Sequence, residues 1–170
     1  MRILAAIGTL AVLAGIAGAV FFFGGFYSIA ATQNDPGVVA AALIRVRTAS
    51  IRHFATDRPP ASYGDAATVQ DGARAFAARG CANCHGGPGV GWAKFSEGLN
   101  PGPPDLKEVA PGLTPAEVFW VVKSGIRMTG MPSFGAIGTP DDEVWKITAF
   151  VKALPQVSDK DYAAWTAAKP

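Results

Sequence analysis

Five consecutive residues near the middle of the chain, Cys81-Ala82-Asn83-Cys84-His85, carry the clearest chemistry in the sequence. The spacing C-x-x-C-H is the attachment signature of a c-type haem. Two thiols add to the two vinyl groups of one porphyrin, and the next residue supplies an imidazole to the iron. One helical turn brings both sulfurs to the edge of the macrocycle and leaves His85 beneath the metal. The motif therefore predicts one covalently bound haem c, attached outside the cytoplasm.

Other interpretations of these residues leave part of the motif unexplained. A zinc site needs about four nitrogen or sulfur ligands, but the chain has two cysteines and two histidines, with His53 far upstream. A thioredoxin-like C-x-x-C belongs in a βαβ pattern, which the neighbouring sequence lacks. A structural disulfide between Cys81 and Cys84 leaves His85 without a role.

Length and charge set limits on the rest of the chain. Its 170 residues fit one compact domain plus an extra segment, and we find no internal repeat. The formal net charge of +2 does not indicate a nucleic-acid partner. The charge is uneven, because residues 1–61 contain five arginines and two aspartates and are therefore the basic part.

The first segment has the composition of a membrane element, since no side chain from Ile3 to Ala31 is charged. As a helix this stretch would be about 43 Å long, more than the roughly 30 Å hydrocarbon core of a bilayer. A cleaved signal peptide is the alternative, with a possible cleavage site at Ala17-Gly18-Ala19, but its apolar region should run only about 7–15 residues. We therefore expect residues 1–34 to form an uncleaved transmembrane anchor.

Haem attachment also decides the orientation of this anchor. The haem must lie on the periplasmic side, so the N-terminus is cytoplasmic, and Arg2 agrees with the positive-inside rule. The arginines at 45–58 partly oppose that rule. An aromatic belt near the outer end consists of Phe21, Phe22, Phe23, Phe26 and Tyr27. We expect a single-pass protein of a bacterial inner membrane.

Residues 35–65 are expected to form a basic juxtamembrane helix and a linker. The helix should run from Val38 to Phe54, since Asp35 and Pro36 are N-terminal signals. Arg45 and Arg52 share one face. An apolar side can be formed by Val39, Ala42, Leu43, Val46 and Phe54. Such a helix beside a membrane span usually lies on lipid headgroups, and docking onto a partner subunit is the alternative.

Residues 66–170 should form an all-α haem domain, because no strand periodicity is present. A first helix, about 67–79, runs into the haem motif, and a loop rich in glycine and proline follows it. Thr114-Pro115-Ala116-Glu117 is a capping box that opens a helix over 115–124. The last long helix starts at 139–142 and ends at Ala153, and a short final helix is expected over 159–168.

Over residues 69–155 the chain resembles the class I cytochromes c, monohaem electron carriers. The matching pieces, in order, are Gly72 and Phe76, Pro103-Pro104-Asp105-Leu106, Gly130-Met131-Pro132, and Trp145 with Phe150-Val151-Lys152-Ala153-Leu154. The resemblance implies that the first and last helices cross at Gly72 and that the Pro104 carbonyl accepts the ring N–H of His85. The anchor, the arginine helix and the tail after Pro155 depart from the family pattern, which leaves the choice of partner open.

The second axial ligand of the iron is expected to be Met131. Pro132 biases Met131 toward an extended conformation, and Gly130 permits a tight turn, so the loop can direct a thioether toward iron. Met128, His53 and an open site are the alternatives. The predicted metal ligands are therefore His85 and Met131, with Cys81, Cys84 and Pro104 completing the cofactor-binding residues.

These ligands indicate an electron carrier and not an enzyme. Ligation by His and Met raises the reduction potential, and a filled sixth position leaves no site for oxygen or substrate. We expect a haem c subunit of a membrane-bound respiratory or dehydrogenase complex, with redox proteins, membrane lipid and an integral membrane subunit as partners. The alternatives are a tethered shuttle between respiratory or photosynthetic complexes and, more distantly, a haem sensor or peroxidase. A basic docking rim could be formed by Lys94, Lys107, Lys123 and Arg127.

Overall fold

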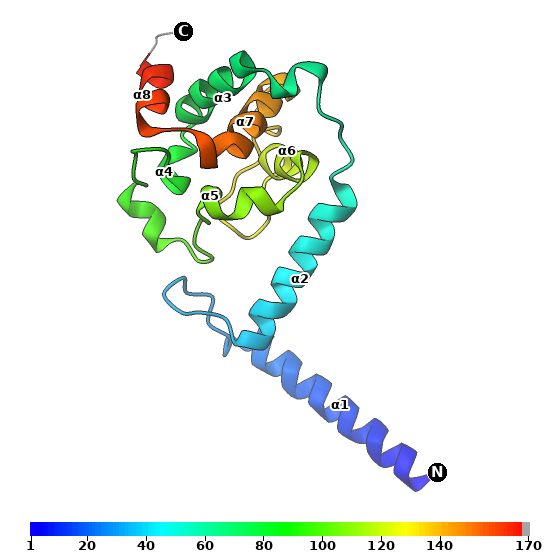
Figure 1. The fold of residues 1–170 in the computed structure, drawn as a ribbon. Helices are drawn as coiled ribbons and strands as arrows, with labels where there is room; N and C mark the ends of the chain where they lie inside the picture. Colours follow the sequence, from blue (N-terminus) through cyan, green and yellow to red (C-terminus); the bar gives the residue numbers. More distant parts are fainter. Residues whose placement is uncertain (168–170) are drawn as a thin grey trace. The chain divides into compact units, whose positions relative to one another are not determined.

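The computed structural model describes residues 1–167, and every regular element within them is a helix (Figure 1). The predicted all-α fold is confirmed for this part of the chain. The α-helices are α1 Arg2–Phe23, α2 Gly37–Phe54, α3 Ala66–Ala78, α4 Ala82–His85, α5 Leu106–Val109, α6 Pro115–Ser124, α7 Asp141–Ala153 and α8 Asp159–Ala167. Short 3-10 segments are η1 Ala61–Gly64, η2 Lys94–Gly98, η3 Ala110–Gly112 and η4 Leu154–Gln156. The predicted end of the final helix, at residue 168, lies outside the described residues.

The chain divides into two compact units, and the first is Met1–Asn34. Its helix α1 has 22 residues and is long and apolar enough to cross a membrane, by length and composition. At 1.5 Å per residue it spans about 33 Å, close to the hydrocarbon thickness. The helix does not continue to Ala31, because Gly25 takes a positive φ of 79° and turns the chain. The Tyr27 ring then lies 5.1 Å from the Phe22 ring.

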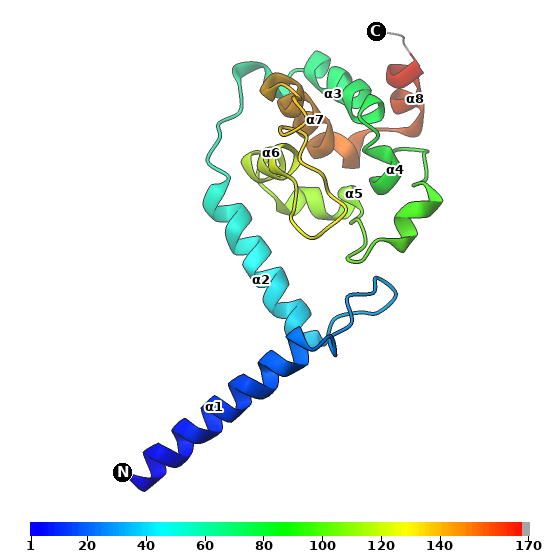
Figure 2. The ribbon, with the colours of Figure 1, turned by 180° about the vertical axis from the view of Figure 1, so that it is seen from behind.

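The second unit begins at Asp35 and is built on the crossing of α3 and α7, with α6 packed against α7 (Figure 2). A Cβ atom on Gly72 would lie 1.9 Å from the carbonyl oxygen of Lys146, so the two helices can approach this closely only at a glycine. The predicted role of Gly72 is confirmed. Beside the crossing, the rings of Phe76 and Phe150 meet edge to face with centroids 5.2 Å apart, and both side chains are buried.

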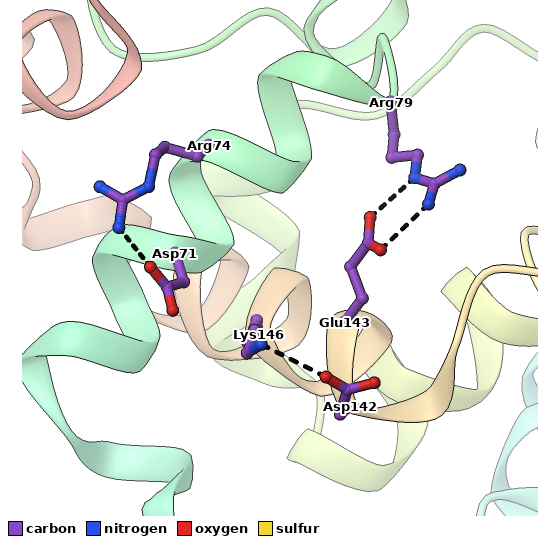
Figure 3. A network of polar contacts seen from close by, with 6 residues as sticks. All are labelled: Asp71, Arg74, Arg79, Asp142, Glu143 and Lys146. Atoms are coloured by element: carbon purple, nitrogen blue, oxygen red, sulfur yellow. Dashed lines mark hydrogen bonds and ion pairs between the residues drawn. The ribbon is translucent and has the colours of Figure 1, made fainter. Parts of the chain in front are cut away.

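An ion pair joins the end of α3 to the first turn of α7 (Figure 3). Arg79 binds both carboxylate oxygens of Glu143, at 2.7 and 3.0 Å. The hydrogen bonds from the Arg79 guanidinium hold the pKa of Glu143 below its ordinary value. The other pairs in this network, Asp71 with Arg74 and Asp142 with Lys146, each lie within one helix. Arg79 and Glu143 are therefore the pair in this network that ties two helices together.

Helix α6 begins with the predicted capping box, which is confirmed. The Glu117 N–H donates to the Thr114 hydroxyl at 3.2 Å, and the Thr114 N–H donates to the Glu117 carboxylate at 2.7 Å. Further along the helix, the Phe119 ring stacks on the Trp145 ring of α7 with centroids 4.1 Å apart. The capped start and this stacking make α6 a firmly held element.

The last turn of α2 packs against α6. Ile51 is buried there, the Phe54 ring stacks on the Trp120 ring with centroids 6.2 Å apart, and Arg52 Nε lies 3.8 Å from the Glu117 carboxylate. Of the predicted apolar side, Phe54 takes part in this contact and Leu43 and Val46 are exposed, whereas the buried Ile51 was not among its predicted members. Helical periodicity identifies apolar sides but does not show which one a neighbouring helix will cover.

Candidate haem site

The haem motif forms a single helical turn directly after α3. Gly80 ends α3 with a positive φ of 74°, a conformation that glycine adopts without strain. The N–H of His85 then donates to the Cys81 carbonyl at 3.0 Å, which closes α4. Cys81 and Cys84 are both free thiols. Both sulfurs and the imidazole therefore belong to one short, fixed piece of backbone.

Cys81 lies against the hydrophobic core of the domain. Burial raises the pKa of its thiol to about 12, since the thiolate would lose its hydration. A thioether has no ionisable proton, so this buried position suits a sulfur that is alkylated rather than one that acts as a free thiolate.

The imidazole of His85 is oriented by the proline segment that precedes α5. His85 Nδ1 lies 3.0 Å from the carbonyl oxygen of Pro104, which is the contact that the resemblance implied. A carbonyl oxygen can only accept, so Nδ1 carries the proton and Nε2 keeps its lone pair for a metal. Asp105 caps the start of α5, because its carboxylate accepts a hydrogen bond from the Lys107 N–H at 2.8 Å.

Two hollows that share part of their lining open beside this imidazole. Both have His85, Trp92 and Asp105 in their walls. The first is also lined by Cys84, Leu99, Gly102, Pro103 and Pro104. Cys84 and an imidazole in the metal-binding tautomer lie at largely apolar walls, and Cys81 is one helical turn from His85, so the donor set fits a covalently attached haem.

The methionine loop contacts the wall of the first hollow at Gly130, although neither Gly130 nor Met131 is itself a lining residue. A Cβ atom on Gly130 would lie 2.8 Å from Leu99 Cδ1, and Leu99 lines that hollow. Met131, the next residue, packs against the hydrophobic core. Met128 is instead 91% exposed and takes a positive φ of 60°. Like Met131, His53 is in the wall of neither hollow, and its ring lies against Phe54 on α2.

Helix α8 covers the loop that follows His85. Tyr162 is 2% exposed, and its ring stacks on Phe150 with centroids 5.5 Å apart. A Cβ atom on Gly87 would meet the Tyr162 ring at 3.3 Å, and one on Gly89 would meet the Asp159 side chain at 3.0 Å. The two glycines therefore let α8 lie directly on this loop.

Several contacts around the site were not predicted from the sequence. Lys152 Nζ donates to the carbonyl oxygens of Ala110 at 2.7 Å and Leu113 at 2.5 Å, which ties α7 to the segment after α5. Thr129 and Ser133 hydrogen-bond within the methionine loop. Their position two residues either side of Met131 was the available clue.

The suggested basic rim is partly neutralised within the chain. Lys123 pairs with Asp141 at 2.8 Å, and Lys94 pairs with Glu97. Two of its four cations therefore already have acidic neighbours.

Residues 67–151, which include the haem motif, both hollows except Leu154, and the methionine loop, match the family model described as cytochrome C oxidase, cbb3-type, subunit III. The match covers half of the 170-residue chain. No curated protein and no solved structure matches the chain.

Proposed function

Because the chain belongs to the family described as cytochrome C oxidase, cbb3-type, subunit III, we propose that it is a membrane-anchored monohaem cytochrome that serves as a fixed subunit of a respiratory or dehydrogenase complex. The family indicates electron transfer by a c-type cytochrome with covalently bound haem c and redox partners. It also indicates an electron carrier rather than an enzyme. The number of haems, the ligands, the anchor and the complex are our proposals.

The observation that carries the proposal is the 3.0 Å contact between His85 Nδ1 and the Pro104 carbonyl beside an apolar hollow. When bound, a haem supplies reversible one-electron exchange at its iron. Cys81 and Cys84 would hold it by thioether bonds, and His85 would present Nε2 to the metal. The hydrogen bond to Pro104 fixes the imidazole tautomer and increases the basicity of Nε2.

Met131 is the second axial ligand in this proposal. It is supported by the contact of Gly130 with Leu99 and by the exposure of Met128, the alternative methionine. A thioether ligand favours reduced iron and so raises the potential. A filled sixth position also excludes the chemistry of a peroxidase or a gas sensor.

We propose that residues 1–34 anchor the protein in a bacterial inner membrane, that 35–65 form the juxtamembrane segment, and that 66–170 bind haem in the periplasm. The connection between α1 and α2 is only residues 24–36. At about 3.5 Å per residue, this segment allows a reach of about 45 Å. A tether this short favours a fixed subunit over a long-range shuttle, with lipid and an integral membrane subunit as neighbours.

Haem attachment is tested by denaturing electrophoresis with haem-peroxidase staining. The wild-type chain should give a stained band, and the double variant Cys81→Ala/Cys84→Ala should give none. Equal staining of the two proteins would overturn the assignment. The ratio of haem to chain should be one.

The fixed-subunit assignment is tested by purifying the full-length protein in mild detergent and identifying what co-elutes. We expect an integral membrane oxidoreductase subunit in stoichiometric amount. The control is a chain that starts at Asp35 behind a cleavable signal sequence, which should lose this partner. Recovery of the full-length protein alone, from membranes that still transfer electrons through it, would favour the tethered shuttle.

A further inference from the structure

Two hydroxyl groups flank Met131, one two residues before it and one two residues after it. The Thr129 hydroxyl donates to the Ile126 carbonyl at 2.7 Å and accepts from the Met131 N–H at 3.1 Å. The Ile126 N–H donates to the Met131 carbonyl at 3.1 Å. Both backbone polar groups of Met131 are therefore bonded within the loop 126–131.

The second hydroxyl ties the other side of the loop to α6. Ser133 Oγ donates to the Lys123 carbonyl at 2.7 Å and accepts from the Ala136 N–H at 3.1 Å. The Gly135 N–H donates to the same carbonyl at 2.9 Å. The last carbonyls of a helix lack partners within it, and here the methionine loop supplies them.

The backbone of the loop lies directly on the end of α6. A Cβ atom on Gly125 would lie 2.7 Å from the Pro132 carbonyl carbon and from the Ser133 nitrogen. Pro132 has no backbone N–H to donate. The hydrogen bonds that hold the backbone around it come from the hydroxyls of Thr129 and Ser133. Val118, Phe119 and Val122 of α6 are buried in the core, which makes α6 a firm support.

We infer that Thr129 and Ser133, here called the hydroxyl clasp, are positioning residues for Met131. The inference rests on the proposed function, in which Met131 is an axial ligand. The clasp holds the Met131 backbone against α6 and so keeps its thioether on the metal. An external ligand reaches the iron only while the loop is released. Its apparent affinity is therefore proportional to the fraction of molecules in the released state, and a larger released fraction gives tighter binding.

Titration of the ferric full-length holoprotein with imidazole in detergent measures this release. Thr129→Val removes both hydroxyl bonds while keeping the side-chain shape, and should tighten apparent imidazole binding about tenfold. Ser133→Ala should tighten it about threefold or more. The weak far-red absorption band of methionine-to-iron ligation should weaken in parallel.

Two further variants serve as controls. Thr129→Ser keeps the hydroxyl and should restore imidazole affinity to within about twofold of wild type. Thr166→Val removes a hydroxyl on α8 that donates to the Tyr162 carbonyl at 2.8 Å, and it should leave imidazole binding unchanged. Urea midpoints are measured for all variants, since a merely structural role would lower the midpoint without changing imidazole affinity.

Each outcome decides the inference. Imidazole affinity unchanged in both Thr129→Val and Ser133→Ala, with a far-red band that Met131→Ala abolishes, overturns the clasp and leaves the proposed ligand standing. A far-red band that survives Met131→Ala overturns both. If Thr129→Val does not accumulate with haem, Ser133→Ala decides the question by the same titration.

Discussion

Met128 and Met131 are three positions apart, yet their side chains have opposite surroundings: the first is exposed and the second packs against the core. We predict that Met131→Ala abolishes the far-red band, lowers the reduction potential and lets carbon monoxide bind the reduced iron. The reason is that the variant removes a thioether ligand and opens the sixth position. Absorption spectra and a redox titration check this.

Met128→Leu is the matched control for this prediction and should leave the spectrum and the potential unchanged. Loss of the far-red band in Met128→Leu alone would move the ligand to Met128. Loss in neither variant would point to His53.

At the scale of single elements, the close approach of α3 to α7 depends on Gly72, which has no side chain. We predict that Gly72→Ala lowers the free energy of unfolding by about 3 kcal/mol, since the added methyl group would force the two helix backbones apart. Gly64→Ala is the control, because a Cβ atom there meets nothing within 4 Å, and it should change stability by less than about 0.5 kcal/mol. Denaturant unfolding measures both. Equal stability of the two variants would show that α3 and α7 can separate without cost.

The pair that joins these helices makes stability depend on pH. The folded-state pKa of Glu143 lies below its ordinary value, first because of the hydrogen bonds from Arg79. The stabilisation is therefore fully present above the unfolded pKa of about 4.3 and is lost as the pH falls through the folded value. We predict that Glu143→Gln is less stable than wild type at pH 7 and that the difference disappears in acid.

A double-variant cycle checks this assignment. Arg79→Gln should remove the same pH-dependent increment, and the combined variant should lose no more than either single one. A pH dependence that survives in Arg79→Gln would assign it to another group.

Elements with local signals were predictable from the sequence. The capping box of α6 and the turn from Cys81 to His85 depend on residues within four positions of each other, and Gly72 followed from the family pattern. The contact of Ile51 with α6 and the bonds from Lys152 to carbonyls about forty residues away were not predictable. Those contacts depend on where distant backbone lies in space, and no local spacing encodes that.

The same distinction applies to the end of α1. The uncharged stretch to Ala31 predicted a membrane element, but charge alone does not show where a helix stops. The paired glycines at 24 and 25 were the signal, since Gly25 adopts a positive φ.

At the scale of the whole molecule, the arginines of α2 separate into two groups. All three arginines are exposed, but Arg52 lies 3.8 Å from the Glu117 carboxylate of the same chain. We predict that Arg45→Gln/Arg47→Gln leaves the haem spectrum and potential unaltered but slows electron transfer from the native donor up to about tenfold, since each arginine near anionic lipid contributes about 1 kcal/mol. Turnover in native membranes measures the effect.

Salt dependence separates the two possible targets of these arginines. A defect that fades as salt rises indicates lipid headgroups, and one that persists and belongs to a single arginine indicates a protein partner. Arg52→Gln is the comparison, which should instead weaken the packing of α2 on α6. Unchanged turnover at every salt concentration would leave residues 35–65 as a spacer.

Because α8 covers the loop after His85, this loop stays uncovered until α8 has been synthesised. α8 is the last of the described helices to be synthesised. Until it arrives, Gly87 and Gly89 lack their cover, and the Phe150 ring lacks the partner that stacks on it. If the haem domain is exported as proposed, its two cysteines in α4 emerge before α8 covers the loop that follows them. The direction of synthesis then leaves an interval in which haem can be attached.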